Sequence, residues 1–152
     1  MSWLQTQVKE NPQKIFIKEG EQAFSYIEIS QMVQVYIKAF LQEGIQPHDR
    51  ILIYLPGGIE MVEIILCCFE IGAIATPISR RLTKSERDAV IKTIQPRLII
   101  TNWSERDALR SVSYPHSCIE ELPGSSGGCS MFINEYDKNP DDVCVILLTA
   151  GT

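Results

Sequence analysis

Hydrophobic and polar positions alternate along the chain in blocks that predict strands and helices in turn. Short apolar runs predict strands that are buried on both faces, as in parallel sheets. These runs occupy residues 50–55, 73–78, 97–101 and 141–148. Nearer the N-terminus, residues 14–26 instead predict a hairpin of two short strands around Glu19 and Gly20.

Blocks with helical periodicity lie between these runs, and two of them begin with a capping box. In this motif a hydroxyl residue and a glutamate three positions later satisfy two backbone N–H groups that a helix start leaves free. The two pairs are Ser25 with Glu28 and Thr83 with Glu86. The first helix should run to Gly44, and the second should end before Pro96. The expected apolar face of the first helix consists of Ile29, Val33, Tyr36 and Phe40.

A third helix is predicted for residues 59–71. Its acidic residues Glu60, Glu63 and Glu70 fall within one narrow sector at 100° per residue, and its other faces are apolar. Such a composition predicts a buried helix. Gly72 is a suitable residue to end it.

The alternation of buried strands with capped helices predicts an α/β fold. We expect a mostly parallel sheet with helices on both faces, the helices beginning near Tyr26, Ile59 and Lys84. Residues 113–140 contain the sequence PGSSGG and little periodicity, so we expect them to form an exposed, partly mobile connection. A chain of 152 residues is long enough to form a single domain with a substantial core.

The composition is that of a globular protein, with 45% hydrophobic and 22% charged residues and a net charge of −5. Basic residues are scattered, and their one tight group is interleaved with acids, which favours a solvated helix face over a nucleic-acid surface. This group comprises Arg80, Arg81, Lys84 and Arg87. A membrane span of about 20 apolar residues is not expected, because charged residues, glycine and proline interrupt the most apolar stretch.

The cysteines predict neither a zinc site nor a disulfide framework. There are five, without a C-x-x-C motif, and His48 and His116 do not lie at ligand spacing from any of them. The cysteines are Cys67, Cys68, Cys118, Cys129 and Cys144. Together with the lack of a secretory signal in the first residues, this pattern predicts a cytoplasmic protein with reduced thiols and no metal site.

Two glycine-bearing turns follow predicted strands. Residues 55–60, LPGGIE, precede a helix but lack a nucleotide-binding motif, so we interpret them as a structural reversal. Residues 149–152, TAGT, carry hydroxyl and backbone N–H groups that are suited to an anion-binding concavity. Four small residues are a weak signal on their own.

A family resemblance strengthens the second candidate. From ENPQKIFIKEGEQAFSYIEI through GIQPHDRILIYLPGGIEMVEIILCCFEIGAIATPISRRLT to DDVCVILLTAGT, the chain resembles the N-terminal part of acyl-CoA synthetases of the adenylate-forming superfamily. The resemblance covers nearly the whole chain except residues 102–138. It implies a flavodoxin- or Rossmann-like subdomain.

The resemblance also implies a partial ATP site. In this family the corresponding strand leads into a phosphate loop rich in Ser, Thr and Gly, whose start is matched by Thr149, Gly151 and Thr152, whereas Ala150 replaces the usual serine. The chain would then stop within the loop. The implied parent enzyme uses ATP, Mg²⁺ and CoA, and its catalytic and metal-binding residues would lie beyond Thr152, so that this part alone is inactive.

The segment with Pro77, Ser79, Arg81 and Leu82 resembles that of CoA ligases more than that of peptide-synthetase domains, and o-succinylbenzoate-CoA ligases are a similar group. The implied partners are a small carboxylic acid and CoA, not nucleic acid or membrane. Two alternatives remain open: part of an adenylation domain that loads a carrier protein, and a naturally short, non-catalytic α/β module. Bare apolar faces on a partial domain also predict self-association.

Overall fold

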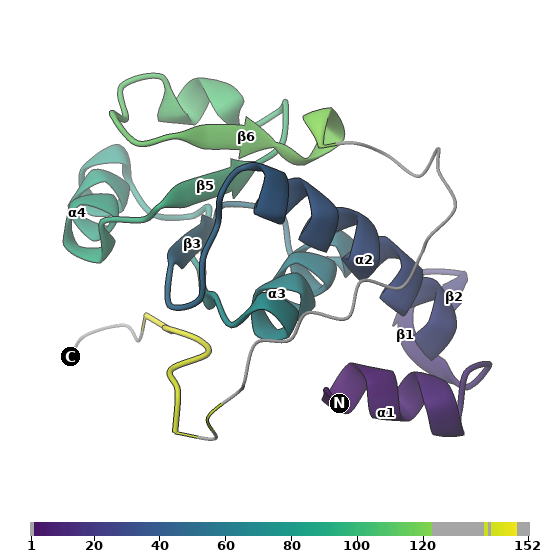
Figure 1. Ribbon diagram of the computed structural model, residues 1–152. Coiled ribbons are helices and arrows are strands. Elements are labelled where there is room, and N and C mark those ends of the chain that lie inside the picture. Colours follow the sequence, from purple (N-terminus) through teal and green to yellow (C-terminus); the bar gives the residue numbers. More distant parts are fainter. Residues whose placement is uncertain (1, 123–138, 140, 149–152) are drawn as a thin grey trace.

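The computed structural model describes residues 2–122, 139 and 141–148. At its centre lies a four-stranded sheet with the strand order β4–β3–β5–β6, and all three pairings are parallel (Figure 1). The strands are β3 (Arg50–Ile53), β4 (Ile74–Pro77), β5 (Leu98–Thr101) and β6 (His116–Cys118). The α-helices are α1 (Trp3–Glu10), α2 (Tyr26–Gln42), α3 (Ile59–Ile71) and α4 (Lys84–Ile94). The predicted α/β class with a parallel sheet is confirmed.

The strand order explains how helices come to cover both faces of the sheet. β3 leads through α3 to β4 on one side, and β4 then leads through α4 to β5 on the other side of β3. Because crossovers between parallel strands are right-handed, two crossovers that step in opposite directions place their helices on opposite faces. This order also matches the first four strands of flavodoxin-like sheets, and the reversal lies between β3 and β5.

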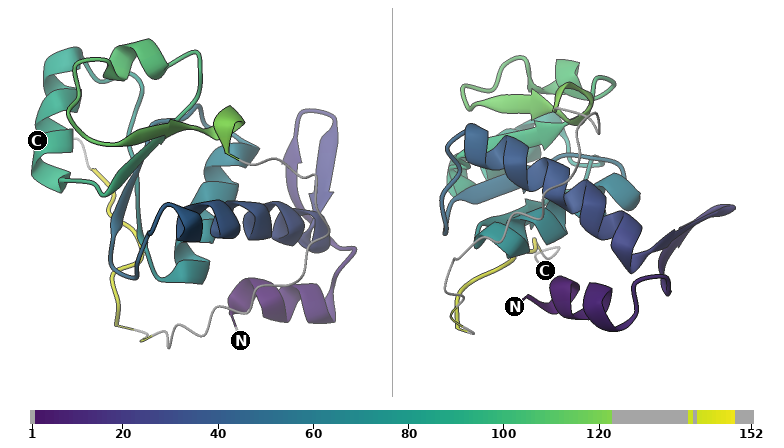
Figure 2. Two further views of the ribbon diagram at one scale, coloured as in Figure 1. Left: turned by 45° about the horizontal axis from the view of Figure 1, so that its top comes forward. Right: turned by 45° about the vertical axis from the view of Figure 1, so that its right-hand side comes forward.

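Each face of the sheet has its own apolar core. On one face Ile51 and Ile53 of β3 belong to the core that α2 and α3 cover; on the other, Leu52 and Tyr54 belong to the core that α4 covers. All four side chains are at most 2% exposed. Figure 2 shows α2 and α3 on the side of the sheet opposite α4. Because successive side chains of a strand point to opposite faces, β3 contributes residues to both apolar cores.

Both predicted capping boxes form. At the start of α4 the Thr83 backbone N–H donates to Glu86 Oε2 at 2.8 Å, and the Glu86 N–H donates to Thr83 Oγ1 at 3.3 Å. The same reciprocal pair joins Ser25 and Glu28 at the start of α2. Because these hydrogen bonds favour the ionised carboxylates, they lower the pKa of Glu28 and of Glu86.

The helix ends also follow the prediction. Gly72 has φ of +74° and its N–H donates to the Cys68 carbonyl, a left-handed C-cap that favours glycine. α2 ends two residues before Gly44, and α4 ends two residues before Pro96. Among the described helices, none has both the length and the apolar character needed to cross a membrane.

The N-terminal hairpin forms a separate antiparallel sheet. Its strands are β1 (Ile15–Glu19) and β2 (Gln22–Ser25). The base of the hairpin is held by an aromatic cluster, in which Phe16 stacks on Tyr26 with ring centroids 4.8 Å apart and meets Trp3 edge-on at 5.6 Å. Trp3 belongs to α1, a helix that the sequence analysis did not predict.

One stretch of the expected exposed connection is ordered. Residues 116–118 form β6, and a 3₁₀ turn (η2, Ile119–Glu121) follows. Cys118, Ile119 and Leu122 are buried. A strand of three residues is too short to produce a recognisable alternation, which explains why the sequence did not indicate it. Residues 123–138 and 140 of the expected connection lie outside the described residues.

The prediction of a buried strand at residues 141–148 is wrong. Within this run Val145 alone forms a bridge, in the parallel direction, with Ala75 of β4. The side chains of Val143, Leu147 and Leu148 are 46 to 66% exposed. Since no described element covers the outer side of this run, hydrophobicity alone does not bury it.

Candidate functional site

The carboxyl ends of the parallel strands form the edge at which ligands bind in open α/β sheets. The segment that leads to residues 149–152 joins the sheet next to β4. The Ala75 N–H donates to the Cys144 carbonyl at 3.0 Å, and the Ile146 N–H donates to the Ala75 carbonyl at 2.9 Å. Because the bridge is parallel, the chain at Val145 runs in the same direction as β4.

The predicted phosphate-loop residues themselves lie outside the described residues. They are Thr149, Ala150, Gly151 and Thr152. The structure follows the chain to Leu148, whose side chain is 46% exposed. Contact of these four residues with ATP phosphates therefore stays a prediction.

Two residues that the sequence analysis did not single out lie next to the reversal in strand order. Tyr54 follows β3 directly and Thr101 ends β5; the Tyr54 N–H continues the ladder by donating to the Ile100 carbonyl at 2.8 Å. The guanidinium carbon of Arg87 on α4 lies 5.7 Å from the centroid of the Tyr54 ring. This is a cation–π distance. Arg87 thus packs against the sheet on its α4 side, where the strand order reverses.

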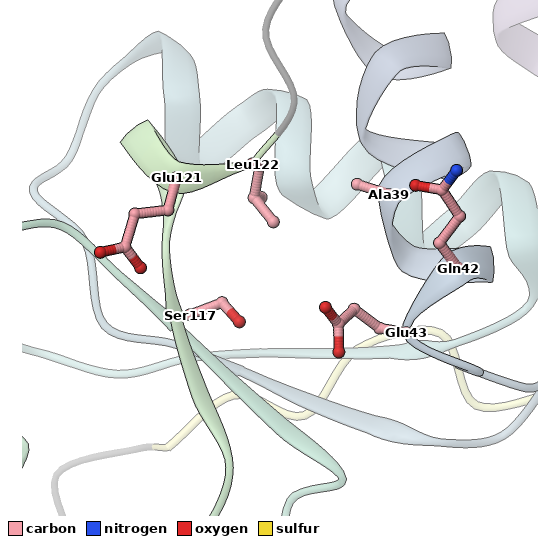
Figure 3. A pocket seen from close by; sticks show the side chains of 6 residues that line it. All are labelled: Ala39, Gln42, Glu43, Ser117, Glu121 and Leu122. Carbon is pink, nitrogen blue, oxygen red and sulfur yellow. The ribbon is translucent and has the colours of Figure 1, made fainter.

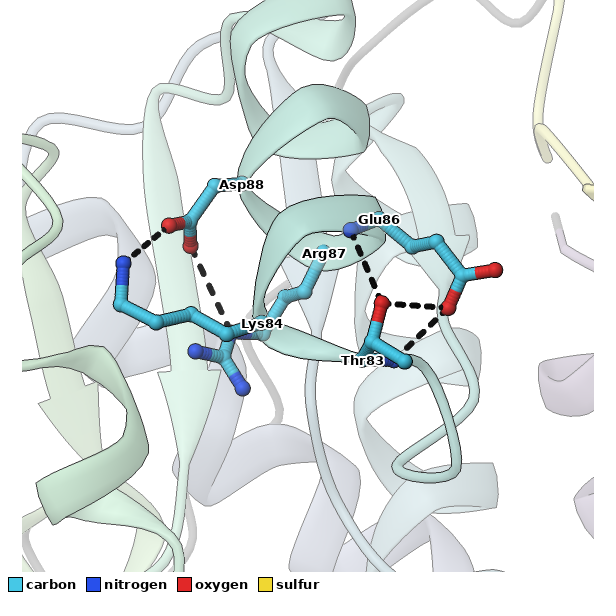
Figure 4. Close-up of polar contacts among 5 residues, drawn as sticks. All are labelled: Thr83, Lys84, Glu86, Arg87 and Asp88. Atoms are coloured by element: carbon cyan, nitrogen blue, oxygen red, sulfur yellow. Dashed lines mark hydrogen bonds and ion pairs between the residues drawn. The ribbon is translucent and has the colours of Figure 1, made fainter.

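The expectation that Arg87 lies on a solvated helix face is wrong, because the residue is only 6% exposed. Its Nε lies 3.7 Å from Asp88 Oδ1, and both atoms are buried without a hydrogen bond (Figure 4). Asp88 is held from outside by Lys84, whose Nζ donates to Oδ2 at 2.6 Å. Arg87 lies four residues before the buried Ile91, and this spacing is the sequence signal that places it on the inward face.

The residues that suggested a CoA ligase lie between β4 and α4. Pro77 closes β4, and Leu82 packs against the core beneath α4. Arg81 is exposed, and its backbone N–H donates to Ser79 Oγ at 3.1 Å. Arg81 is therefore a surface residue that precedes the Thr83 cap of α4.

In the other glycine-bearing turn, residues 55–60, a side chain of the protein takes the place that an anionic ligand would need. Gly58 is the N-cap of α3 and offers no side chain, so the Ile59 N–H donates instead to Glu19 Oε1 of β1 at 3.2 Å. A Cβ atom at Gly58 would lie 2.6 Å from the same oxygen. A carboxylate of the protein thus caps this helix, which supports the structural interpretation of the turn.

The acidic sector of α3 is partly buried. Glu63 and Glu70 are 4% and 7% exposed, whereas Glu60 is exposed. Burial raises the pKa of Glu63 to about 7, and the charges of Glu60 and Glu19 act in the same direction, while a hydrogen bond with Tyr36 of α2 opposes them. Burial and the neighbouring carboxylates also raise the pKa of Tyr36. Glu63 is therefore an ionisable group inside the α2–α3 interface.

A pocket of about 220 Å³ lies between the end of α2 and β6 (Figure 3). Its lining residues are Ala39, Gln42, Glu43, Ser117, Glu121 and Leu122. Glu43 and Glu121 give the lining two negative charges and it contains no basic residue. Since phosphate groups are repelled by such a lining, this pocket is not suited to the phosphates of a nucleotide.

Among residues 2–122, 139 and 141–148, no group of three or more His, Cys, Asp or Glu is placed to hold a metal ion. The described cysteines are free thiols, with Cys144 exposed and the other three buried. Burial raises the pKa of Cys67, Cys68 and Cys118, so these thiols are poor nucleophiles. Cys129 lies outside the described residues.

Comparison with known proteins identifies the family. The family model described as AMP-binding enzyme matches residues 4–152. The chain is 25% identical over 154 residues to the 2-succinylbenzoate–CoA ligase of Oceanobacillus iheyensis, covering 99% of this chain. It is 27% identical over 151 residues to the crotonobetaine/carnitine–CoA ligase of Escherichia fergusonii, covering 85% of this chain.

A solved structure agrees with the fold. O-succinylbenzoate Coenzyme A synthetase (MenE) from Bacillus subtilis, in complex with ATP and magnesium ion, superposes with a TM-score of 0.75 at 19% identity over 84% of this chain and 35% of that chain. The present chain spans only 31% and 28% of the lengths of the two CoA ligases. The family match extends over nearly all of its residues, and the chain therefore belongs to the AMP-binding enzyme family.

Proposed function

We propose that the chain is the N-terminal part of an ATP-dependent acyl- or aryl-CoA ligase. In the proposed reaction a carboxylate attacks the α-phosphate of ATP, which gives an acyl-adenylate and releases pyrophosphate. The CoA thiol then attacks the acyl carbon, which gives the thioester and releases AMP. Family membership and the similarity to two proteins named as CoA ligases support this proposal.

The observation that carries the proposal is the bridge between Ala75 and Val145. It pairs the segment before Thr149 with β4 in the parallel direction, and this direction supports the inference that the chain after it leads to the carboxyl edge of the sheet. A strand that is followed by hydroxyl and glycine residues at this edge is a suitable start for a phosphate-binding loop.

Within this loop, the hydroxyls of Thr149 and Thr152 and the backbone N–H groups of Ala150 and Gly151 would donate hydrogen bonds to phosphate oxygens. Ala150 lacks the hydroxyl of a serine but keeps its N–H. Donors placed around the departing pyrophosphate stabilise the charge that develops there. The described residues do not form a magnesium site, so no step is assigned to a metal ion. We assign the acid pocket and the adenine contacts to the remainder of the enzyme.

Formation of acyl-CoA tests this proposal. The chain, continued through the reading frame that follows Thr152, is incubated with ATP, CoA and a panel of carboxylic acids, and products are identified by mass spectrometry. 2-Succinylbenzoate is the first acid to include, because a relative is named for it. We expect an acyl-CoA and AMP from the continued chain, and neither product from the 152-residue chain or without ATP.

The same assay separates the alternatives. An acyl-adenylate without any CoA thioester would indicate an adenylation domain that loads a carrier protein. A lack of both products over a broad acid panel would contradict the ligase proposal and favour a non-catalytic α/β module.

A further inference from the structure

Tyr54 and Thr101 lie side by side where the strand order reverses, between β3 and β5. The two strands are in register at Leu52 and Ile99, and the Tyr54 N–H donates to the Ile100 carbonyl at 2.8 Å, so Tyr54 and Thr101 form the next matching pair. Leu52, Tyr54 and Ile99 belong to the core that α4 covers. Since side chains alternate along a strand, Thr101 faces the same core. Open α/β sheets bind ligands at such a reversal.

Buried polar atoms without a hydrogen-bond partner gather in this layer. Within the described residues there are four of them: Thr76 Oγ1, Arg87 Nε, Asp88 Oδ1 and Thr101 Oγ1. Arg87 and Asp88 belong to α4, and Thr76 pairs in register with Leu52, so that its side chain also faces the core that α4 covers. Buried polar groups of folded proteins nearly always have a partner. Their concentration on one face of the sheet therefore points to a polar ligand in this layer.

Arg87 supplies the positive charge of this layer. It is 6% exposed, and its guanidinium carbon lies 5.7 Å from the centroid of the Tyr54 ring. Asp88 Oδ1 lies 3.7 Å from Arg87 Nε, which is longer than a hydrogen bond, and Lys84 holds the other oxygen of Asp88 at 2.6 Å. The Nε–H is thus a free donor next to Tyr54. The Thr101 side chain lies on the other side of Tyr54, about 5 Å away across the sheet.

We propose that Arg87 and Thr101 bind a small oxyanion with a single charge, such as a carboxylate, between α4 and the carboxyl end of the sheet. The Nε–H and the Thr101 hydroxyl would donate to its oxygens, and the guanidinium would supply the opposite charge. A single charge is favoured over a double one, because the layer is buried and the Asp88 carboxylate adjoins it. This inference does not depend on the proposed ligase activity, and the anion is not assigned as the substrate of that reaction.

Nuclear magnetic resonance of the arginine side chains in the 152-residue chain tests this site. The Arg87 Nε–H signal, identified by its loss in Arg87→Met, is followed during titration with acetate, and sodium chloride at equal ionic strength is the reference. We expect a saturable shift with a dissociation constant on the order of 1 to 10 mM, within reach of a few charge-assisted hydrogen bonds. The Nε–H of Arg110, whose side chain is 77% exposed, reports nonspecific association and should not saturate. Sulfate, a dianion, should bind more weakly than acetate.

Two threonine variants form a matched pair. Thr101→Val removes the hydroxyl and keeps the shape of the side chain, so acetate binding should weaken about five- to tenfold. Thr76→Val makes the same change at an equally buried hydroxyl, next to Leu52 rather than Tyr54, and should leave binding unchanged. Acetate should also raise the unfolding temperature of the wild-type protein but not that of Arg87→Met, which keeps a similar volume without the charge.

Three results would overturn the site. The first is an Arg87 Nε–H signal that stays fixed, or moves only in proportion to that of Arg110, up to about 100 mM acetate, well above the expected dissociation constant. The second is an equal loss of binding in Thr101→Val and Thr76→Val. The third is tighter binding of sulfate than of acetate. Circular dichroism of each variant verifies that its helices are intact.

Discussion

Val145 pairs with Ala75 in the parallel direction and so extends the sheet by one residue beyond β4. Two backbone hydrogen bonds, of 3.0 and 2.9 Å, make this connection. The chain at Val145 therefore runs in the same direction as β4, whose carboxyl end lies at the edge that α/β proteins use for ligands. The apolar residues around Val145 remain exposed, and this exposure leads to the first prediction.

The exposed apolar run should make the 152-residue chain associate with itself. Leu147 is 66% exposed and flanks an unpaired strand edge, a combination that favours pairing between molecules. Sedimentation velocity should show species larger than the 17.2 kDa monomer. Leu147→Lys should weaken association about tenfold or more, since burial of a leucine contributes about 1.5 to 3 kcal/mol. Leu41→Lys, at an exposed leucine on α2, is the matched control; equal effects of the two changes, or a strictly monomeric wild type, would contradict this prediction.

Arg87 should contribute to stability through packing rather than through charge. Its Nε is buried without a hydrogen bond, and Asp88 keeps Lys84 as a partner when Arg87 is removed. Urea unfolding of Arg87→Met should therefore give a stability within about 1 kcal/mol of wild type or higher, because a similar apolar volume replaces a buried charge. Arg87→Ala should lose about 2 kcal/mol or more through the cavity. If the methionine variant is as unstable as the alanine variant, the charge itself is essential.

The capping box at the start of α4 should be worth about 1 kcal/mol. Thr83→Ala removes the oxygen that accepts the Glu86 N–H, so unfolding in urea should occur at a lower concentration. Thr93→Ala is a suitable control within the same helix, since the exposed Thr93 hydroxyl donates only to the preceding turn at Ala89. A loss in Thr93→Ala as large as that in Thr83→Ala would show that helix propensity, not the cap, is responsible.

Glu63 should make the protein less stable as the pH rises. The pKa of Glu63 in the folded protein, about 7, lies above its ordinary value. The contribution of the neutral Glu63 side chain to the free energy of unfolding is therefore fully present below about pH 4.5, and it is lost as the pH rises through 7. Glu63→Gln should match wild type near pH 5 and exceed it by about 1 to 3 kcal/mol near pH 8, because each pKa unit corresponds to 1.36 kcal/mol. Identical wild-type and Glu63→Gln profiles would show that folding leaves the pKa of Glu63 unchanged, which would contradict this prediction.

Helix starts and ends could be predicted from the sequence where the contacts that define them join residues within one turn. The capping pairs at Ser25 and Thr83 mark helix starts, and Gly72 marks a helix end, because each acts through its own turn. Five strands, β1 to β5, were also predicted, because apolar or alternating residues form long enough runs there. β6 was missed because three residues carry too little pattern.

Features that depend on contacts between residues far apart in the sequence could not be predicted from local patterns. The Glu19 cap on Ile59 joins residues 40 positions apart, and the stacking of Arg87 on Tyr54 depends on how α4 lies on the sheet. The burial of residues 141–148 was predicted wrongly because apolar character does not reveal what covers a strand. The phosphate loop, self-association and a cytoplasmic location remain predictions.

The most direct test of the central claim, that residues 149–152 begin the phosphate loop of a ligase, is acid-dependent ATP–pyrophosphate exchange. It is measured with the chain continued through the reading frame after Thr152, with Thr152→Val, and with Thr93→Val as a control for the same chemical change on the exposed face of α4. The continued chain and Thr93→Val should exchange equally, and Thr152→Val should be slower by about 10²-fold, the cost of losing one donor to a developing negative charge. Exchange by Thr152→Val at the rate of the unchanged enzyme would contradict the assignment of this loop.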